Sequence, residues 1–168
     1  MTAPDVVIHS YRPRGAALDL FRCRDPEVLL SGPAGTGKSR ACLEKLDQLA
    51  LRNPVMKGLI VRKTLASLGA TALDTYRKHV AAEALEAGLV RYYGGSRQEP
   101  AQYVYGNGSA IHIGGMDKAT KIMSSEYDAI YVQEAIELTE DDWEALTTRL
   151  RNGMISFQQL LADTNPSA

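Results

Sequence analysis

The fold class follows from residues 27–39, which read EVLLSGPAGTGKS. Glu27–Ser31 is a short apolar run of the kind that forms a buried strand, and a helical pattern begins at Lys38 and ends near Arg52, just before a proline. Between them, Gly32–Ser39 match the pattern G-x-x-x-x-G-K-[ST] in full. A strand, a glycine-rich turn and a helix in this order predict a phosphate-binding loop in an α/β fold.

The residue types in this loop suit the binding of a nucleoside triphosphate. Glycines let the backbone curl so that successive N–H groups point at phosphate oxygens, and the following helix adds its partial positive charge. In such loops the lysine, here Lys38, reaches the terminal phosphates, and the hydroxyl of Ser39 holds Mg²⁺. We therefore expect ATP and Mg²⁺ as cofactors. The expected nucleotide-binding residues are Gly32, Pro33, Ala34, Gly35, Thr36, Gly37, Lys38, Ser39 and Arg40.

The rest of the chain continues the alternation of strands and helices. Strands are predicted at 58–62, 127–132 and 159–163, and helices at 16–21, 64–87 and 140–151, the second ending at Gly88 and the third capped by Thr139 with Asp142. The β-like segments 89–93, 102–105 and 109–113, with Gly106–Gly108 between the last two, predict a hairpin insertion. The expected fold is a three-layer P-loop NTPase fold with a mainly parallel central sheet flanked by helices.

Composition limits the organisation of the chain and its partners. The 168 residues suit a single domain, 1–168, and 45% hydrophobic with 23% charged residues is ordinary for a folded protein. Lysine and arginine number 19 against 20 acidic residues, so contact with DNA would require a local patch or several copies acting together. No stretch reads as a secretory signal or a membrane span, so we expect a soluble, intracellular protein without a membrane partner.

An acidic strand end supplies the second expected part of the site. P-loop ATPases of the additional-strand class place two acids after an apolar strand, one for Mg²⁺ and one to orient the attacking water. Here the strand that ends at Val132 is followed by Gln133 and Glu134. We expect Lys38 and Glu134 to be catalytic, and Ser39 and Glu134 to hold Mg²⁺. Gln133 can orient a metal-bound water, but its neutral amide cannot offset the charge of the metal.

The next apolar strand ends in Asp163-Thr-Asn-Pro166. ATPases of this class place a polar residue at that point, where it senses the γ-phosphate and passes its loss to the rest of the machine. Thr164 and Asn165 are the candidates for this coupling role. A plain turn is an equally good interpretation of these four residues taken alone.

These motifs together resemble the ATPase domain of the large terminase subunit of tailed bacteriophages. The resemblance depends on Gly32–Ser39, Leu59–Thr64, Tyr127–Trp143 and Asp163–Pro166, and it covers the chain from about Tyr11 to the end. It implies a ring of identical subunits that hydrolyses ATP to drive double-stranded DNA into procapsids, in the host cytoplasm and transiently on the portal vertex. It also implies the portal protein and the small terminase subunit as partners, and a C-terminal nuclease domain that this sequence does not contain.

The resemblance further implies a positively charged residue that acts on the neighbouring subunit's nucleotide. Lys118 and Lys121, before the acidic strand, and Arg149 or Arg151, after it, are the candidates. Two other functions stay open: another DNA-dependent, helicase-like ATPase, and an assembly module that binds nucleotide without hydrolysing it. Gln133 is the feature that keeps the second of these open.

Overall fold

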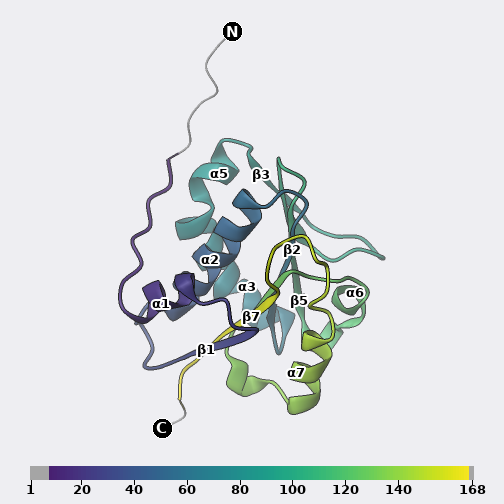
Figure 1. Cartoon of the computed structure of the whole chain (residues 1–168). Coiled ribbons are helices and arrows are strands. Elements are labelled where there is room, and N and C mark those ends of the chain that lie inside the picture. Colours follow the sequence, from purple (N-terminus) through teal and green to yellow (C-terminus); the bar gives the residue numbers. More distant parts are fainter. Residues whose placement is uncertain (1–7, 167–168) are drawn as a thin grey trace.

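The computed structural model describes residues 8–166 and shows a seven-stranded sheet with helices on both faces (Figure 1). Its strands lie in the order β1-β7-β6-β2-β5-β4-β3. The first five are parallel, β4 pairs antiparallel with β5, and β3 pairs antiparallel with β4, which confirms the expected α/β fold with its mainly parallel sheet. The strands are β1 (Glu27–Ser31), β2 (Lys57–Arg62), β3 (Val90–Tyr93), β4 (Gln102–Tyr105), β5 (Ala110–Gly115), β6 (Ala129–Val132) and β7 (Gln159–Thr164).

The helices are short, with one exception. α2 (Lys38–Arg52) is the longest at 15 residues and follows the glycine-rich loop, as predicted. The others are α1 (Ala16–Arg22), α3 (Leu65–Gly69), α4 (Ala72–Thr75), the π-helix η1 (Tyr76–Val80), α5 (Ala82–Glu86), the 3-10 turns η2 (Met116–Lys118) and η3 (Ala135–Glu137), α6 (Thr120–Met123) and α7 (Glu140–Thr147). Within residues 8–166, none of these helices has the length and apolar character needed to cross a bilayer.

Two hydrophobic cores, one on each face of the sheet, make the fold three-layered. Successive residues of a strand point to opposite faces. Ile60, Tyr131 and Leu161 accordingly belong to a core formed with α1, α2 and the segment from α3 to η1. Their neighbours, such as Val61, Val132 and Ala162, belong to a second core with α6 and α7. The central strands are therefore buried on both sides, which explains their continuous apolar sequence.

The predicted long helix over 64–87 is wrong, because the structure divides this segment into four short elements. The first break follows Gly69, where the Thr71 hydroxyl contacts Arg62 and Gln133 at the end of neighbouring strands. A π-helical turn then brings the hydroxyl of Tyr76 to the buried carboxylate of Asp47. Only tertiary contacts select these breaks, since the local pattern favours a continuous helix. The predicted end does hold, because Gly88 adopts a left-handed φ of 72°.

The helix predicted over 140–151 begins as expected and ends early. Thr139 and Asp142 form the predicted capping box, in which each side chain accepts a hydrogen bond from the other's backbone N–H. The helix stops at Thr147, four residues before the predicted end. The chain then turns so that Tyr127 N–H donates to the carbonyl of Arg149 at 2.7 Å, which pairs this segment with the residues before β6.

The predicted hairpin is present, and one of its strands belongs to the main sheet. Gly108 takes a φ of 87° in the turn between β4 and β5, which pair antiparallel. β5 also pairs in parallel with β2, from Lys57 opposite Ala110 to Arg62 opposite Gly115. The hairpin thus extends the parallel sheet at its edge.

A buried carboxylate fastens the N-terminal end of β6. Asp128 is fully buried and accepts hydrogen bonds from the N–H groups of Lys57 (3.0 Å) and Met154 (2.8 Å) and from the side chains of Asn152 (2.7 Å) and Gln158 (3.1 Å). It lies at the opposite end of β6 from Glu134, so its role is to hold the loop before β7 against the sheet.

We expect Asp128→Ala to lower the free energy of unfolding by at least about 3 kcal/mol, because four donors lose a charged acceptor and two of them are backbone groups in a buried position. Chemical denaturation measures the change. Asp74→Ala is the control, since Asp74 is half-exposed and pairs only with exposed Lys78, and its effect is expected to stay within about 0.5 kcal/mol. Equal stabilities of the two variants would contradict the structural role of Asp128.

Candidate active site

The glycine-rich turn between β1 and α2 has the shape of a phosphate-binding loop. Gly35 and Gly37 adopt φ values of 76° and 80°, which side chains with a Cβ rarely take. Gly37 is also the N-cap of α2 and provides no side chain to satisfy the first N–H groups of the helix. These N–H groups therefore stay available to an anion, which the helix dipole favours at this end.

The ammonium group of Lys38 lies over this loop. Its Nζ donates to the carbonyl oxygens of Gly32 (2.8 Å) and Pro33 (2.6 Å) and to the side-chain oxygen of Asn165 (3.0 Å). Asn165 in turn donates from Nδ2 to Oε1 of Glu134 at 3.1 Å. One amide thus joins the loop lysine to the carboxylate after β6. The structure brings together Lys38, Glu134 and Asn165, three residues that the sequence singled out on separate elements.

Glu134 is held in an unusual backbone conformation. Its φ of 52° and ψ of 61° lie in the left-handed region, which costs a residue other than glycine about 1–3 kcal/mol and is found most often at functional sites. Two contacts offset that cost: its N–H donates to Oδ1 of Asp163 at 2.9 Å, and its carboxylate accepts from Asn165. The side chain is thereby directed to the cavity beside the loop.

Asp163, at the end of β7, is a site residue that the sequence did not single out. It is almost fully buried, and its Oδ2 accepts hydrogen bonds from the Ser39 hydroxyl and from the hydroxyl of Tyr131 at 2.7 Å. Burial, with the Asp163 carboxylate beside it, raises the pKa of Tyr131 well above its usual range, so this hydroxyl is a neutral donor. The available signal was an aspartate closing an apolar strand two residues before Asn165.

Gln133 does not line the cavity that contains Ser39. Its Oε1 lies 2.7 Å from the hydroxyl of Thr71, at the junction of α3 and α4. Its N–H continues the pairing with β2 by donating to the carbonyl of Val61 at 2.9 Å. The side chain is buried there. Of the two coupling candidates, only Asn165 reaches the loop with its side chain, whereas Thr164 contributes its carbonyl, which accepts from Gly32 N–H at 3.3 Å.

Two cavities meet at the loop and share Thr36, Gly37 and Lys38. One, of about 290 Å³, lies between the loop and α1 and is lined also by Arg14 and Ala17. The other, of about 250 Å³, is lined by loop residues together with Thr75, Glu134, Asp163 and Asn165. The loop therefore has one neighbouring cavity, toward α1, that no carboxylate lines, and a second that is lined by the carboxylates of Glu134 and Asp163.

Arg40 contacts residues outside the glycine-rich loop. Its guanidinium lies 5.3 Å from the ring centroid of Tyr11, and its Nε donates to the buried carboxylate of Glu44 at 3.3 Å. Glu44 is also within 2.9 Å of Nε2 of His9. Arg40 thus connects the segment before α1 to the first turn of α2, while lining the cavity that contains Glu134.

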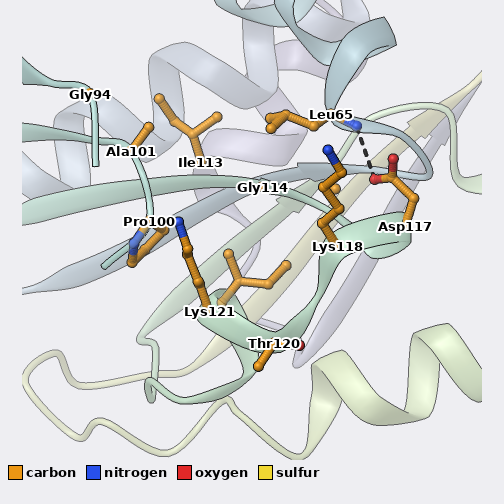
Figure 2. Close-up of a pocket in the computed structure, with 12 residues that line it drawn as sticks. Leu65, Gly94, Pro100, Ala101, Ile113, Gly114, Asp117, Lys118, Thr120 and Lys121 are labelled. Carbon is orange, nitrogen blue, oxygen red and sulfur yellow. Dashed lines mark hydrogen bonds between the residues drawn. The ribbon is translucent and has the colours of Figure 1, made fainter. Parts of the chain in front are cut away.

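Two of the candidate positive residues, Lys118 and Lys121, line a pocket of about 470 Å³ at the C-terminal end of β5 (Figure 2). Both side chains are exposed, and Lys121 donates to the carbonyl of Ser96. Three strands separate β5 from β1 in the sheet, so these lysines do not belong to the chain's own loop. Arg149 is half-buried beside Tyr127, at the opposite edge of the sheet, and Arg151 pairs with Glu126 at 2.8 Å.

Comparison with known families decides what this arrangement belongs to. A family model described as phage terminase large subunit matches residues 26–168, which includes every strand of the sheet. The chain belongs to this family. It also has the fold expected from the resemblance, that of the N-terminal ATPase domain of the terminase large subunit. No curated protein sequence matches the chain.

Solved terminase structures share this fold at low sequence identity. The large terminase ATPase domain of Thermus phage P74-26 superposes with a TM-score of 0.69 at 18% identity, covering 94% of this chain and 66% of that one. The large terminase of a thermophilic bacteriophage in complex with ADP gives 0.64 at 14% identity, over 92% of this chain and 36% of that one. The N-terminal domain of the DNA packaging ATPase of bacteriophage phi29 superposes with a TM-score of 0.63 at 14% identity, covering 92% of this chain and 78% of that one. The chain thus spans about a third of the thermophilic phage terminase that was solved with ADP.

The donor atoms around the loop fit Mg²⁺. Within residues 8–166 there is no group of three or more histidine, cysteine or acidic residues that could hold a metal by itself. The Ser39 hydroxyl and the carboxylates of Glu134 and Asp163 are oxygen donors that line one cavity with the loop. Mg²⁺ keeps several waters and is usually bound by one or two carboxylates together with substrate phosphates, so an incomplete protein cage of oxygens is what it requires.

We expect Lys38→Ala to weaken ATP binding by about 10- to 100-fold, because a charge-assisted hydrogen bond to phosphate contributes about 1.5–3 kcal/mol. Titration calorimetry measures the affinity, and an unchanged unfolding temperature shows that the fold is intact. Lys78→Ala, which removes an exposed lysine from η1, is the matched control. Equal affinities of the Lys38→Ala variant and the unchanged protein would remove Lys38 from the site.

Proposed function

We propose that this chain is the ATPase motor domain of a terminase large subunit, which hydrolyses ATP to drive double-stranded DNA into procapsids. The observation that carries the proposal is the hydrogen-bonded series Lys38–Asn165–Glu134. It connects the residue that would bind the terminal phosphates to the carboxylate that would orient water. Family membership supports the proposal, as do the structures of a thermophilic bacteriophage large terminase in complex with ADP and with ATP-gamma-S.

The geometry suggests how the chain's own groups divide the work. The backbone N–H groups of the loop and Lys38 bind the phosphates, and the cavity beside α1 receives the base and ribose. The cavity with Glu134 receives the γ-phosphate and the attacking water, whose proton Glu134 accepts. Mg²⁺, held at the Ser39 hydroxyl, would neutralise phosphate charge when bound.

Asn165 is suited to couple nucleotide state to the rest of the domain. Its amide accepts from Lys38 and donates to Glu134, and it immediately follows β7. A phosphate that takes over the hydrogen bonds of Lys38 frees Oδ1 of Asn165 and changes the contact that Nδ2 makes with Glu134. Loss of the phosphate restores both contacts. Thr164 transmits this change through its carbonyl, which is bonded to the loop.

A nucleotide-binding module that does not hydrolyse ATP is the second candidate function. Gln133 favours it, because the amide cannot replace the charge of the acid that usually stands at this position and it is directed to Thr71. Steady-state release of phosphate, measured with and without DNA and in the assembled ring, separates the two functions. Saturable nucleotide binding with no turnover in any of these states would support the binding module.

DNA, further copies of the chain, the portal protein and the small terminase subunit are the proposed partners. Arg62 and Lys63, at the sheet edge that carries the loop, already have acidic partners in the chain itself. Arg62 makes two contacts with Glu137, at 2.7 and 3.0 Å, and Lys63 pairs with Asp142 at 2.7 Å. DNA contact would therefore come from other exposed cations, such as Lys118, or from several subunits together.

We expect Glu134→Gln to lower the rate of ATP hydrolysis by about 100-fold or more, because positioned general bases contribute about 10²–10⁴. Nucleotide affinity measured in EDTA should stay unchanged, since the amide can still accept from Asn165. Phosphate release and calorimetry measure the two quantities. Glu137→Gln, which alters a half-exposed carboxylate three residues away, should hydrolyse ATP at the normal rate. Normal turnover by Glu134→Gln would show that another group orients the water.

Lys118 and Lys121 are the preferred donors of positive charge to a neighbouring subunit, because both are exposed and form no ion pair within residues 8–166, whereas Arg149 is half-buried and Arg151 pairs with Glu126. We expect the Lys118→Ala/Lys121→Ala double variant to lower the ATPase rate of the assembled ring by about 10³-fold or more, which removes the stimulation that assembly produces. Its own loop is intact, so mixing it with Lys38→Ala subunits, which retain the lysines, should restore part of the rate. Full activity of the double variant would direct attention to Arg149 and Arg151.

A further inference from the structure

The structure assigns to Asp163 a role that position 133 does not fill: we propose that Asp163 supplies the carboxylate that stands behind Ser39 and binds the nucleotide-associated Mg²⁺ through that hydroxyl and through water. The proposal rests on the proposed function, since it concerns the cation of the bound nucleotide. ATPases of this class carry an acid at the position of Gln133, at the end of β6. In this chain the negative charge would instead be provided by Asp163, at the end of β7, and we call this replacement the exchange.

Strand register places the two residues side by side. Val132 of β6 pairs with Ala162 of β7, so Gln133 and Asp163 follow at the ends of neighbouring strands. Asp163 also pairs with Leu30 of β1, two residues before the glycine-rich loop. It therefore lies between the loop and the acidic strand end, closer in the sheet to β1 than Gln133 can be.

The hydrogen bonds of Asp163 show which group its charge serves. The Ser39 hydroxyl has one proton, and it donates that proton to Oδ2 of Asp163. The lone pairs of the Ser39 oxygen therefore remain for a cation in the cavity that both residues line. The remaining partners, Tyr131 hydroxyl and Glu134 N–H, are also donors, so these three donors fix the carboxylate in one orientation.

Gln133 takes no part in this arrangement. Its amide oxygen is 2.7 Å from the Thr71 hydroxyl, on the side of β2 and α3, whereas Asp163 faces β1 and α2. A neutral amide directed to Thr71 offers the cation no charge. A carboxylate bonded to Ser39 does, and divalent cations in phosphate sites require that charge in addition to phosphate oxygens.

The test measures how strongly Mg²⁺ strengthens nucleotide binding. Titration calorimetry gives the dissociation constant of ATP-gamma-S in Mg²⁺ and in EDTA. The constant in EDTA divided by the constant in Mg²⁺, called here the Mg²⁺ ratio, measures how much the cation contributes to binding and requires no turnover. Asp163→Asn keeps the size and the acceptor oxygen, so we expect affinity in EDTA to be retained and the Mg²⁺ ratio to fall by about 10-fold or more, the usual loss when a partner of a metal ligand is changed. Glu137→Gln, which removes one nearby negative charge outside the cavity, should leave the ratio within about twofold.

The exchange between the two strand ends gives a sharper test. Adding Gln133→Asp to Asp163→Asn returns a carboxylate to the neighbouring strand end and should recover most of the Mg²⁺ ratio. A folded double variant without recovery would contradict the exchange. Gln133→Met in the otherwise unchanged chain should have no effect on the ratio, and a 10-fold loss there would assign the cation to Gln133 and overturn the proposal, whether or not Asp163→Asn folds.

Failure of the inference is distinguishable from failure of the proposed function. If the unchanged protein binds ATP-gamma-S more tightly with Mg²⁺ and Asp163→Asn, folded by its thermal unfolding, retains the full ratio, Asp163 does not bind the cation and the nucleotide site stands. If the unchanged protein binds no ATP-gamma-S in either buffer, the nucleotide site itself is disproved, and this role of Asp163 with it.

Discussion

Parallel pairing of β7 with both β1 and β6 is the constraint on which the site depends. It brings three strand ends to one edge of the sheet: the glycine-rich loop after β1, Glu134 after β6, and Asp163 with Asn165 at the end of β7. No two of these segments are close in sequence. Because the carboxyl ends of parallel strands share an edge, one register decides all three positions together.

Asp163 connects the parts that this register assembles. A buried carboxylate is unfavourable unless hydrogen bonds satisfy it, and here the donors come from α2, β6 and the residue after Gln133. One of these bonds, from the N–H of Glu134, supports the left-handed conformation of that residue. Asp128 shows the contrast at the other end of β6: it is also buried and accepts four hydrogen bonds, but its donors lie at the edge without the glycine-rich turn.

The positively charged side chains near the loop edge of the sheet differ in whether they have partners within the chain. The chain carries a formal net charge of −1, and the cations at the loop edge of the sheet are engaged: Lys38 with the loop carbonyls and Asn165, Arg62 with Glu137, and Lys63 with Asp142. Lys118 differs, because it is exposed and makes no side-chain hydrogen bond or ion pair with residues 8–166. In the assembly of several copies that we propose, such a residue would be free to meet the nucleotide of a neighbouring subunit.

Sequence patterns predict the α/β class, the boundaries of β1 and α2, the capping box of α7 and the glycine-rich loop, and they select Glu134 and Asn165, which the structure brings next to Lys38. Each of these depends on local rules: proline and glycine at element ends, apolar runs in buried strands, and a motif whose residues are contiguous. Three features appear only in the folded arrangement: residues 64–87 form broken helices, the helix from Glu140 ends at Thr147, and Asp163, rather than Gln133, accepts a hydrogen bond from Ser39. These features arise from contacts between segments far apart in the chain, such as Thr71 with Gln133 and Ser39 with Asp163, and a local pattern contains no information about which strand ends will become neighbours.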